Sequence, residues 1–218
     1  MTDQNHPSSE GEGRLFILFV VGLSLLAAIG GWLVVAYSGL HPQAPGFAPD
    51  HPRTLVSFAL TNQIGRTVTE TELTGKYVVV DFLLTSCSLT CPVVNRHVAE
   101  IQQLTAHQPD VRLLSLTVDP RDDTVAVLAD YGKKYGADPA RWLLLTGDQT
   151  NLYHLIATSF LNQDLNDPFS YMPGNFSHTD RMALVDPQGH VRVYFDGLSD
   201  DVASNVVNAI ADLRKKSL

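Results

Sequence analysis

The sequence predicts an α/β sandwich with a mixed sheet, preceded by one transmembrane helix. Three observations lead to this prediction. An uncharged apolar run of bilayer length lies near the amino terminus. β-branched apolar runs then alternate with amphipathic segments, as they do in α/β domains. Near the carboxyl terminus, an Asp-Pro-Gln-Gly turn separates two further apolar runs, which predicts a hairpin. The 218 residues suffice for one domain and an anchor.

The apolar run covers residues 15–37, and Ser24 is its one polar interruption. A helix over this run would be about 34 Å long, enough to cross a hydrocarbon core of about 30 Å. A cleaved signal peptide is the alternative, with Val34-Val35-Ala36 as its cleavage site. Signal peptides have apolar regions of roughly 7 to 15 residues, so the longer run here favours a retained anchor.

The charges around this run predict its orientation. Arg14 is the one basic residue of the tail 1–14, and the next basic residue is Arg53. The positive-inside rule therefore places the tail in the cytoplasm and the main domain outside. The tail also contains three acidic residues, which is unlike a mitochondrial transit peptide. We expect a bacterial inner membrane protein with its main domain in the periplasm.

Residues 38–52 contain four prolines and predict a semi-extended linker, so the domain is expected over 53–218. A turn at Gly65 separates the first two expected strands, and the third is a continuous β-branched and apolar run typical of a strand buried on both faces. These three strands are predicted over 55–60, 67–69 and 77–84.

The rest of the domain alternates helices and strands. The first helix is expected over 92–106, with Pro92 in its first turn. Asp123 and Asp148 are expected to cap the next two helices. Residues 161–177 have no regular pattern and predict a long loop. The remaining elements are strands over 111–118 and 142–145, helices ending at Tyr135 and Phe160, a hairpin over 181–195 and a last helix over 199–216.

The net charge of −8 argues against nucleic-acid binding, because phosphate recognition needs clustered Lys and Arg. The short basic run Arg214-Lys215-Lys216 ends the last predicted helix. Cations at that position complement the helix dipole, so the run is assigned a structural role.

The two cysteines, Cys87 and Cys91, lie between the central strand and the helix that follows it. This order of strand, cysteine pair and helix is typical of the active site of a thioredoxin-like fold. If the segment is helical or nearly so, cysteines four residues apart place both sulfurs on one side, where they can share a metal or form a disulfide. The helix dipole lowers thiol pKa values there, and soft thiolates favour Cu(I). Two inert structural cysteines are the less favoured alternative.

His178 stands out among the eight histidines because it ends the long unpatterned loop, directly before the predicted hairpin. A loop beside the sheet edge can bring its imidazole over the helix start. From the residues alone, a single His is more often structural or solvent-facing, so both interpretations stay open. Met172 in the same loop is assigned to packing, and Asp119 is assigned a structural role at a strand end.

From about Phe58 to Leu213 the chain resembles the Sco/SenC family of copper-binding assembly proteins. The matching segments, in order, are Gly75-Lys76, Thr85-Ser86-Cys87-Ser88-Leu89-Thr90-Cys91-Pro92, Val118-Asp119-Pro120, Asp123-Thr124, Leu145-Thr146-Gly147, His178 and Leu184-Val185-Asp186-Pro187-Gln188-Gly189. The chain departs from the family pattern at Leu84, often aromatic, at Ser88-Leu89, often Pro-Asp, and at Ser177, commonly Asp.

The resemblance implies a thioredoxin-like fold with Cys87, Cys91 and His178 as copper ligands. It implies binding of Cu(I), with Cu(II) as a second state, and delivery to the dinuclear copper centre of cytochrome c oxidase subunit II or another copper protein. A copper donor and a thiol reductant are the further partners implied.

Two other functions remain open from the sequence. A thiol–disulfide oxidoreductase would use Cys87 and Cys91 to reduce oxidase cysteines or other exported thiols, without needing His178. A peroxiredoxin-like peroxidase is disfavoured, because the sequence lacks the Thr and Arg arrangement expected around a peroxidatic cysteine. A metallochaperone is preferred over an enzyme.

Overall fold

The computed structural model describes residues 18–30, 46, 48–49, 51–160 and 180–216. It divides into two units, Met1–Ala44 and Pro45–Leu218. In the first unit, residues 18–30 form a helix with exposed apolar side chains. No helix within the described residues is long and apolar enough to span a membrane. Both ends of the predicted anchor, residues 15–17 and 31–37, lie outside the described residues.

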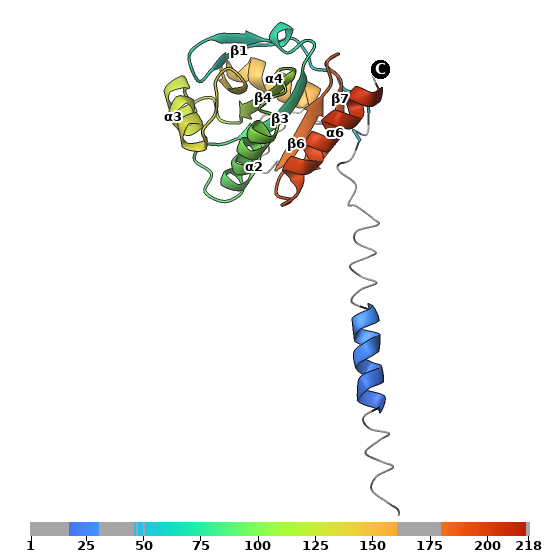
Figure 1. Ribbon diagram of the computed structural model, residues 1–218. Coiled ribbons are helices and arrows are strands. Elements are labelled where there is room, and N and C mark those ends of the chain that lie inside the picture. The colour runs from blue at the N-terminus through green and yellow to red at the C-terminus, as the bar shows by residue number, and fades with distance from the viewer. Residues whose placement is uncertain (1–17, 31–45, 47, 50, 161–179, 217–218) are drawn as a thin grey trace, which may run out of the picture. The chain divides into compact units, whose positions relative to one another are not determined.

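The second unit is built on one seven-stranded mixed sheet with the order β2-β1-β5-β4-β3-β6-β7 (Figure 1). Strands β3, β4 and β5 run parallel, and the other neighbours pair antiparallel. The strands are β1 (Ala59–Asn62), β2 (Thr67–Thr69), β3 (Tyr77–Leu83), β4 (Val111–Thr117), β5 (Trp142–Thr146), β6 (Arg181–Val185) and β7 (Val191–Asp196). The helices are η1 (Glu70–Glu72), α2 (Cys91–Leu104), α3 (Val125–Tyr135), α4 (Gln149–Ser159) and α6 (Val202–Lys216).

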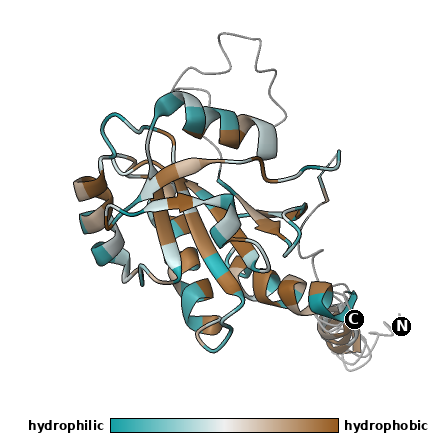
Figure 2. Ribbon diagram, turned by 90° about the horizontal axis from the view of Figure 1, so that it is seen from above, coloured by the Kyte–Doolittle hydropathy of each residue, from teal (hydrophilic) through white to brown (hydrophobic). Residues whose placement is uncertain are grey.

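Helices cover both faces of the sheet, whose hydrophobic strands lie between them in Figure 2. Alternate residues of β3 point to opposite faces, so Val80 packs in the cluster with α4 and Val79 in the cluster with α2, α3 and α6. Helices α2 and α6 lie side by side on the second face (Figure 1). Each face therefore has its own apolar core, which explains why β3 is buried along its whole length.

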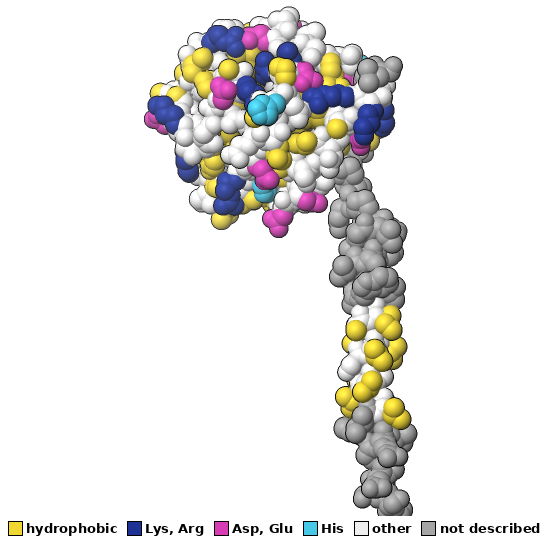
Figure 3. Space-filling model, viewed as in Figure 1, with side chains coloured by type: hydrophobic (Ala, Val, Ile, Leu, Met, Phe, Trp, Pro, Cys, Tyr) yellow, Lys and Arg dark blue, Asp and Glu magenta, His cyan; other side chains and the backbone are white. Residues whose placement is uncertain are grey.

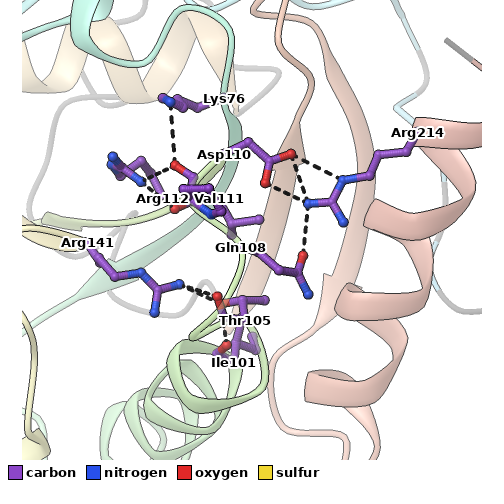
Figure 4. A network of polar contacts seen from close by, with 10 residues as sticks. Lys76, Ile101, Thr105, Gln108, Asp110, Val111, Arg112, Arg141 and Arg214 are labelled. Atoms are coloured by element: carbon purple, nitrogen blue, oxygen red, sulfur yellow. Dashed lines mark hydrogen bonds and ion pairs between the residues drawn. The ribbon is translucent and has the colours of Figure 1, made fainter. Parts of the chain in front are cut away.

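A polar network fastens the end of the sheet at which β3 and β4 begin (Figure 4). Arg214 of α6 donates to both carboxylate oxygens of Asp110, with one N–O distance of 2.8 Å, and to Gln108. The predicted basic end of the last helix is confirmed, and Arg214 forms an ion pair there. The connection that contains the cysteines lies at the opposite end of the sheet, where β3 and β4 finish.

Most predicted elements are confirmed, including the Asp148 cap of α4 and the hairpin turn at Gly189, whose φ is +86°. The prediction of a first strand over 55–60 is wrong, because β1 begins at Ala59. The chain before it pairs with the hairpin turn instead, through hydrogen bonds from Leu55 to Gly189 and from Val191 to Arg53.

The predicted cap of α3 is also wrong. Thr124 is the N-cap, and its hydroxyl accepts from the backbone N–H of Val127. Asp123 is buried and accepts hydrogen bonds from Thr85 of the loop after β3 and from Thr117 at the end of β4. The predicted loop over 161–177 lies outside the described residues.

Candidate metal and thiol centre

The cysteine loop (residues 84–90) connects the end of β3 to the start of α2. It opens with a turn in which the backbone N–H of Cys87 donates to the Leu84 carbonyl at 3.1 Å. Helix α2 begins at Cys91, with Pro92 in its first turn as predicted. Thr90 takes the N-cap position, but its side chain makes no capping hydrogen bond, and its hydroxyl lies 4.0 Å from the Cys87 sulfur instead. The amide groups at this end are therefore left for another acceptor.

That acceptor is the sulfur of Cys87. Partial burial raises the pKa of the Cys87 thiol, but hydrogen bonds from the backbone of Cys91, Leu89 and Thr90 and from the Cys91 thiol outweigh burial and lower this pKa to about 7. A thiolate thus occupies the position that a capping side chain takes in other helices. At neutral pH a large share of Cys87 is ionised and available to bind a metal or attack a disulfide.

Cys91 behaves in the opposite way. Burial raises its pKa to about 11, and the neighbouring Cys87 and Asp81 add to the increase, although the Leu84 backbone opposes it. The two cysteines are free thiols, and the Cys91 thiol donates toward the Cys87 sulfur. The structure therefore brings the two predicted sulfurs together and makes them chemically unequal.

A buried carboxyl group that was not predicted from the sequence, that of Asp81, lies under this end of α2. Asp81 points to the α2 face of β3, accepts a hydrogen bond from Ser115, and has a second carboxylate oxygen without a described partner. Trp142 donates in turn to the Ser115 hydroxyl at 2.8 Å. Burial raises the pKa of Asp81 to about 7, against the hydrogen bond from Ser115. A single carboxyl inside the apolar run of β3 was the available sequence signal.

Asn95 connects Cys91 to α3. Its side-chain amide donates to the Cys91 carbonyl at 2.8 Å and to the Tyr131 hydroxyl at 3.2 Å. Its own side-chain oxygen is buried without a described partner. The first turn of α2 is thereby held against α3, which keeps Cys91 in its half-buried position.

His178 and Met172 lie outside the described residues. The described chain resumes at Asp180, whose carbonyl accepts from the backbone N–H of Gly197 at 2.8 Å. The Gly197 carbonyl is 2.9 Å from Nδ1 of His97 on α2. A Cβ at Gly197 would meet the Asp180 carbonyl at 2.3 Å and a methyl group of Val94 at 3.3 Å, so only glycine permits this close approach. Asp180 therefore lies close to the first turns of α2.

The described residues contain no group of three His, Cys, Asp or Glu side chains able to hold a metal ion. The two sulfurs are the donors that remain, and thiolates suit a soft ion such as Cu(I). Leu89, between the two cysteines, is 80% exposed. On the face in Figure 3, acidic and basic side chains are interspersed, so no field of one sign covers it.

A family model described as SCO1/SenC matches residues 48–214. A curated relative, the SCO1 protein homolog of Bacillus subtilis strain 168, is 29% identical over 157 residues, which cover 70% of this chain and 80% of the relative. The residues matched by the family model include the cysteine loop and the whole sheet.

Solved structures of similar proteins show the same fold. BsSco, described as a member of the Sco family of cytochrome c oxidase assembly proteins with a disulfide switch, is 27% identical with a TM-score of 0.60, covering 75% of this chain and 96% of that chain. Copper-bound ScoI of Bradyrhizobium japonicum is 24% identical with a TM-score of 0.56, covering 71% of this chain and 98% of that chain. These likenesses confirm the thioredoxin-like α/β fold with a mixed sheet.

Proposed function

The chain belongs to the SCO1/SenC family, and from this premise we propose that it is a membrane-anchored copper metallochaperone. Copper is its cargo, bound by Cys87, Cys91 and His178. The recipient is the dinuclear copper centre of cytochrome c oxidase subunit II. The observation that carries the proposal is the pair of sulfurs meeting at the start of α2, one of them with a pKa of about 7.

The donor set matches the chemistry of copper. Thiolate ligands select Cu(I), and imidazole nitrogen suits copper in both oxidation states. Cys87 supplies an ionised sulfur without a large cost at neutral pH, whereas Cys91 must lose a proton to bind. Two relatives point in the same direction: BsSco is described as an oxidase assembly protein, and ScoI was solved with copper bound.

The position of Asp180 supports His178 as the third ligand. Strand β6 runs antiparallel to β3, so the chain entering β6 reaches the sheet at the end where β3 finishes and the cysteine loop begins. Asp180 is held beside Val94, three residues after Cys91. His178 precedes Asp180 by two residues, and two residues span at most about 7 Å. This short connection to a residue beside α2 supports the proposal that the His178 imidazole joins the two sulfurs.

Replacing His178 by alanine tests the ligand set. We expect His178→Ala to weaken copper binding by at least about tenfold, since even the partners of metal ligands contribute about 10- to 100-fold. The measurement is an anaerobic competition titration of the reduced protein with Cu(I). His154→Ala is the matched control, because His154 is exposed on α4. Wild-type affinity in the His178 variant would remove this residue from the site.

The unequal thiols favour a second candidate function, thiol–disulfide exchange. The Cys87 thiolate would attack a client disulfide, forming a mixed disulfide and releasing one client sulfur, which takes up a proton. Cys91 would then lose its proton and attack the Cys87 sulfur, releasing the second client thiol and leaving a Cys87–Cys91 disulfide. An external thiol reductant must restore the pair. Full reductase activity in His178→Ala would support this function. An absence of reductase activity in both the wild type and His178→Ala would exclude it.

The membrane anchor is proposed over residues 15–37, between a cytoplasmic tail 1–14 and a linker 38–52 that precedes the periplasmic domain 53–218. The support is the length of the uncharged run and the helical structure of its described part. Bacterial cells expressing the full chain should retain it in alkali-washed inner membranes, with the domain digested by protease added to spheroplasts. Recovery in the soluble periplasmic fraction would contradict the anchor.

A further inference from the structure

Asp123 is a buried carboxylate whose burial needs an explanation. It is 1% exposed, and no ion pair among the described residues includes it. Burial raises its pKa, against hydrogen bonds from Thr117 and Thr85 that lower it. A carboxylate kept in such a place without a cation is costly, and apolar packing would be cheaper. Its hydrogen bonds indicate what it contributes in return.

The carboxylate joins two loops that leave neighbouring parallel strands. One of its oxygens accepts from the Thr85 hydroxyl, and the other accepts from the Thr117 hydroxyl and, at 3.4 Å, from the Thr85 backbone N–H. Thr117 is the last residue of β4 and pairs with Leu83 at the end of β3. Asp123 therefore fixes the start of the cysteine loop to the end of β4.

Thr85 is the residue through which this contact reaches the thiols. The Leu84 carbonyl accepts from the Cys87 backbone at 3.1 Å, so Thr85 is the first corner residue of the turn that ends on Cys87. Holding the hydroxyl and the amide of Thr85 holds the turn and its last residue. Cys91 is fixed independently by α2 and Asn95.

The other end of the contact is also fixed. The Asp123 backbone N–H donates to the Asp119 carbonyl at 2.9 Å, and the Asp119 N–H donates to the Thr117 hydroxyl at 3.0 Å. Thr124 then begins α3 as its N-cap. The carboxylate is thus attached to a closed ring of hydrogen bonds and not to a freely moving loop.

We propose that Asp123 is a positioning residue which, through Thr85, sets the place of Cys87 relative to Cys91. This inference deepens the proposed function, because the cysteine pair is both the proposed copper site and the proposed redox pair. The distance between two thiols determines how readily they form a disulfide and how well they chelate one metal ion. Asp123 itself touches neither copper nor client.

The test compares the reduction potential of the pair in four full-length proteins: wild type, Asp123→Asn, Thr85→Val and Thr117→Val. Equilibration with glutathione and its disulfide, followed by thiol trapping, gives the fraction of Cys87–Cys91 disulfide. We expect Asp123→Asn and Thr85→Val each to shift this equilibrium about tenfold, which is about 30 mV for a two-electron couple. Both should also weaken Cu(I) binding about tenfold.

Thr117→Val separates positioning from stability. It removes the hydrogen bond from Thr117 to the same carboxylate, together with the one from the Asp119 N–H to the Thr117 hydroxyl, but leaves the Thr85 contacts in place. It should lower the free energy of unfolding at least as much as Thr85→Val while keeping the wild-type reduction potential. An unchanged potential in Thr85→Val, or equal shifts in both threonine variants, would overturn the proposal. If Asp123→Asn fails to fold, the two threonine variants still decide.

The glutathione equilibrium needs neither copper nor His178. A protein that binds no copper would refute the proposed metallochaperone function and would leave the positioning test readable. If His178→Ala weakens copper binding as expected but the reduction potential is unchanged in Thr85→Val and Asp123→Asn, only the positioning role is refuted.

Discussion

Replacing Cys91 with serine should lower the affinity for Cu(I) by more than about a hundredfold. Loss of a partner that merely orients a ligand costs about 10- to 100-fold, and serine removes the ligand itself. A serine hydroxyl is a hard, protonated donor that does not select Cu(I) as a thiolate does. Cys87→Ser should have an effect at least as large, because it removes the sulfur that is already ionised at neutral pH. Competition with a chromophoric Cu(I) chelator under anaerobic conditions measures both variants.

Ser88→Ala is the control for the cysteine variants. Ser88 is exposed and lies between the two cysteines, so its replacement disturbs the same loop without touching either sulfur. Wild-type affinity is expected for this control. Tight Cu(I) binding in both cysteine variants would show that copper binds elsewhere on the chain.

Replacing Asp81 with asparagine should change how the stability of the domain depends on pH. The pKa of Asp81 is about 7 in the folded protein, against 3.8 for an ordinary Asp. Between these values the folded state holds a proton that the unfolded chain releases, so the free energy of unfolding falls as pH rises. Relative to the variant, wild type should lose up to about 4 kcal/mol between pH 4 and pH 8, at 1.36 kcal/mol per pKa unit.

Urea denaturation of the two proteins across this pH range measures the difference. Asparagine retains an oxygen to accept from Ser115, so the packing around the side chain should persist. Asp122→Asn is the control, since Asp122 is exposed and its replacement should change stability by less than about 0.5 kcal/mol. An unchanged pH profile in Asp81→Asn would mean that this carboxyl is ionised in the folded protein.

The main elements were predictable because local pattern and tertiary burial agree in them. Apart from Asp81, the run from Tyr77 to Leu83 is apolar on both faces, and both faces are covered by helices. The first strand was misplaced because residues 53–55 have their partners in the hairpin turn about 135 residues later, which no local pattern reveals.

The N-cap of α3 was mispredicted for a related reason. Asp123 and Thr124 are adjacent, and both residue types favour the N-cap position. The hydroxyls of Thr85 and Thr117 donate to the Asp123 carboxylate, which leaves Thr124 to cap the helix. These two hydroxyls come together only after β3 and β4 pair. Sequence spacing could identify the candidate caps but not the buried ring of hydrogen bonds.

In the site, the sequence predicted that the cysteines lie together but not that they differ. A helix start lowers thiol pKa values in general, and this holds for Cys87. Cys91 is more deeply buried beside Asp81, and desolvation reverses the shift. The role of His178 came from family resemblance, and what the described residues add is the position of Asp180 close to α2.

The most direct test of the central claim is X-ray absorption spectroscopy of the reduced full-length protein loaded with one equivalent of Cu(I). We predict a copper shell of two sulfur atoms and one imidazole nitrogen, with the nitrogen lost in His178→Ala. A shell of nitrogen and oxygen alone, with no sulfur, would contradict the account.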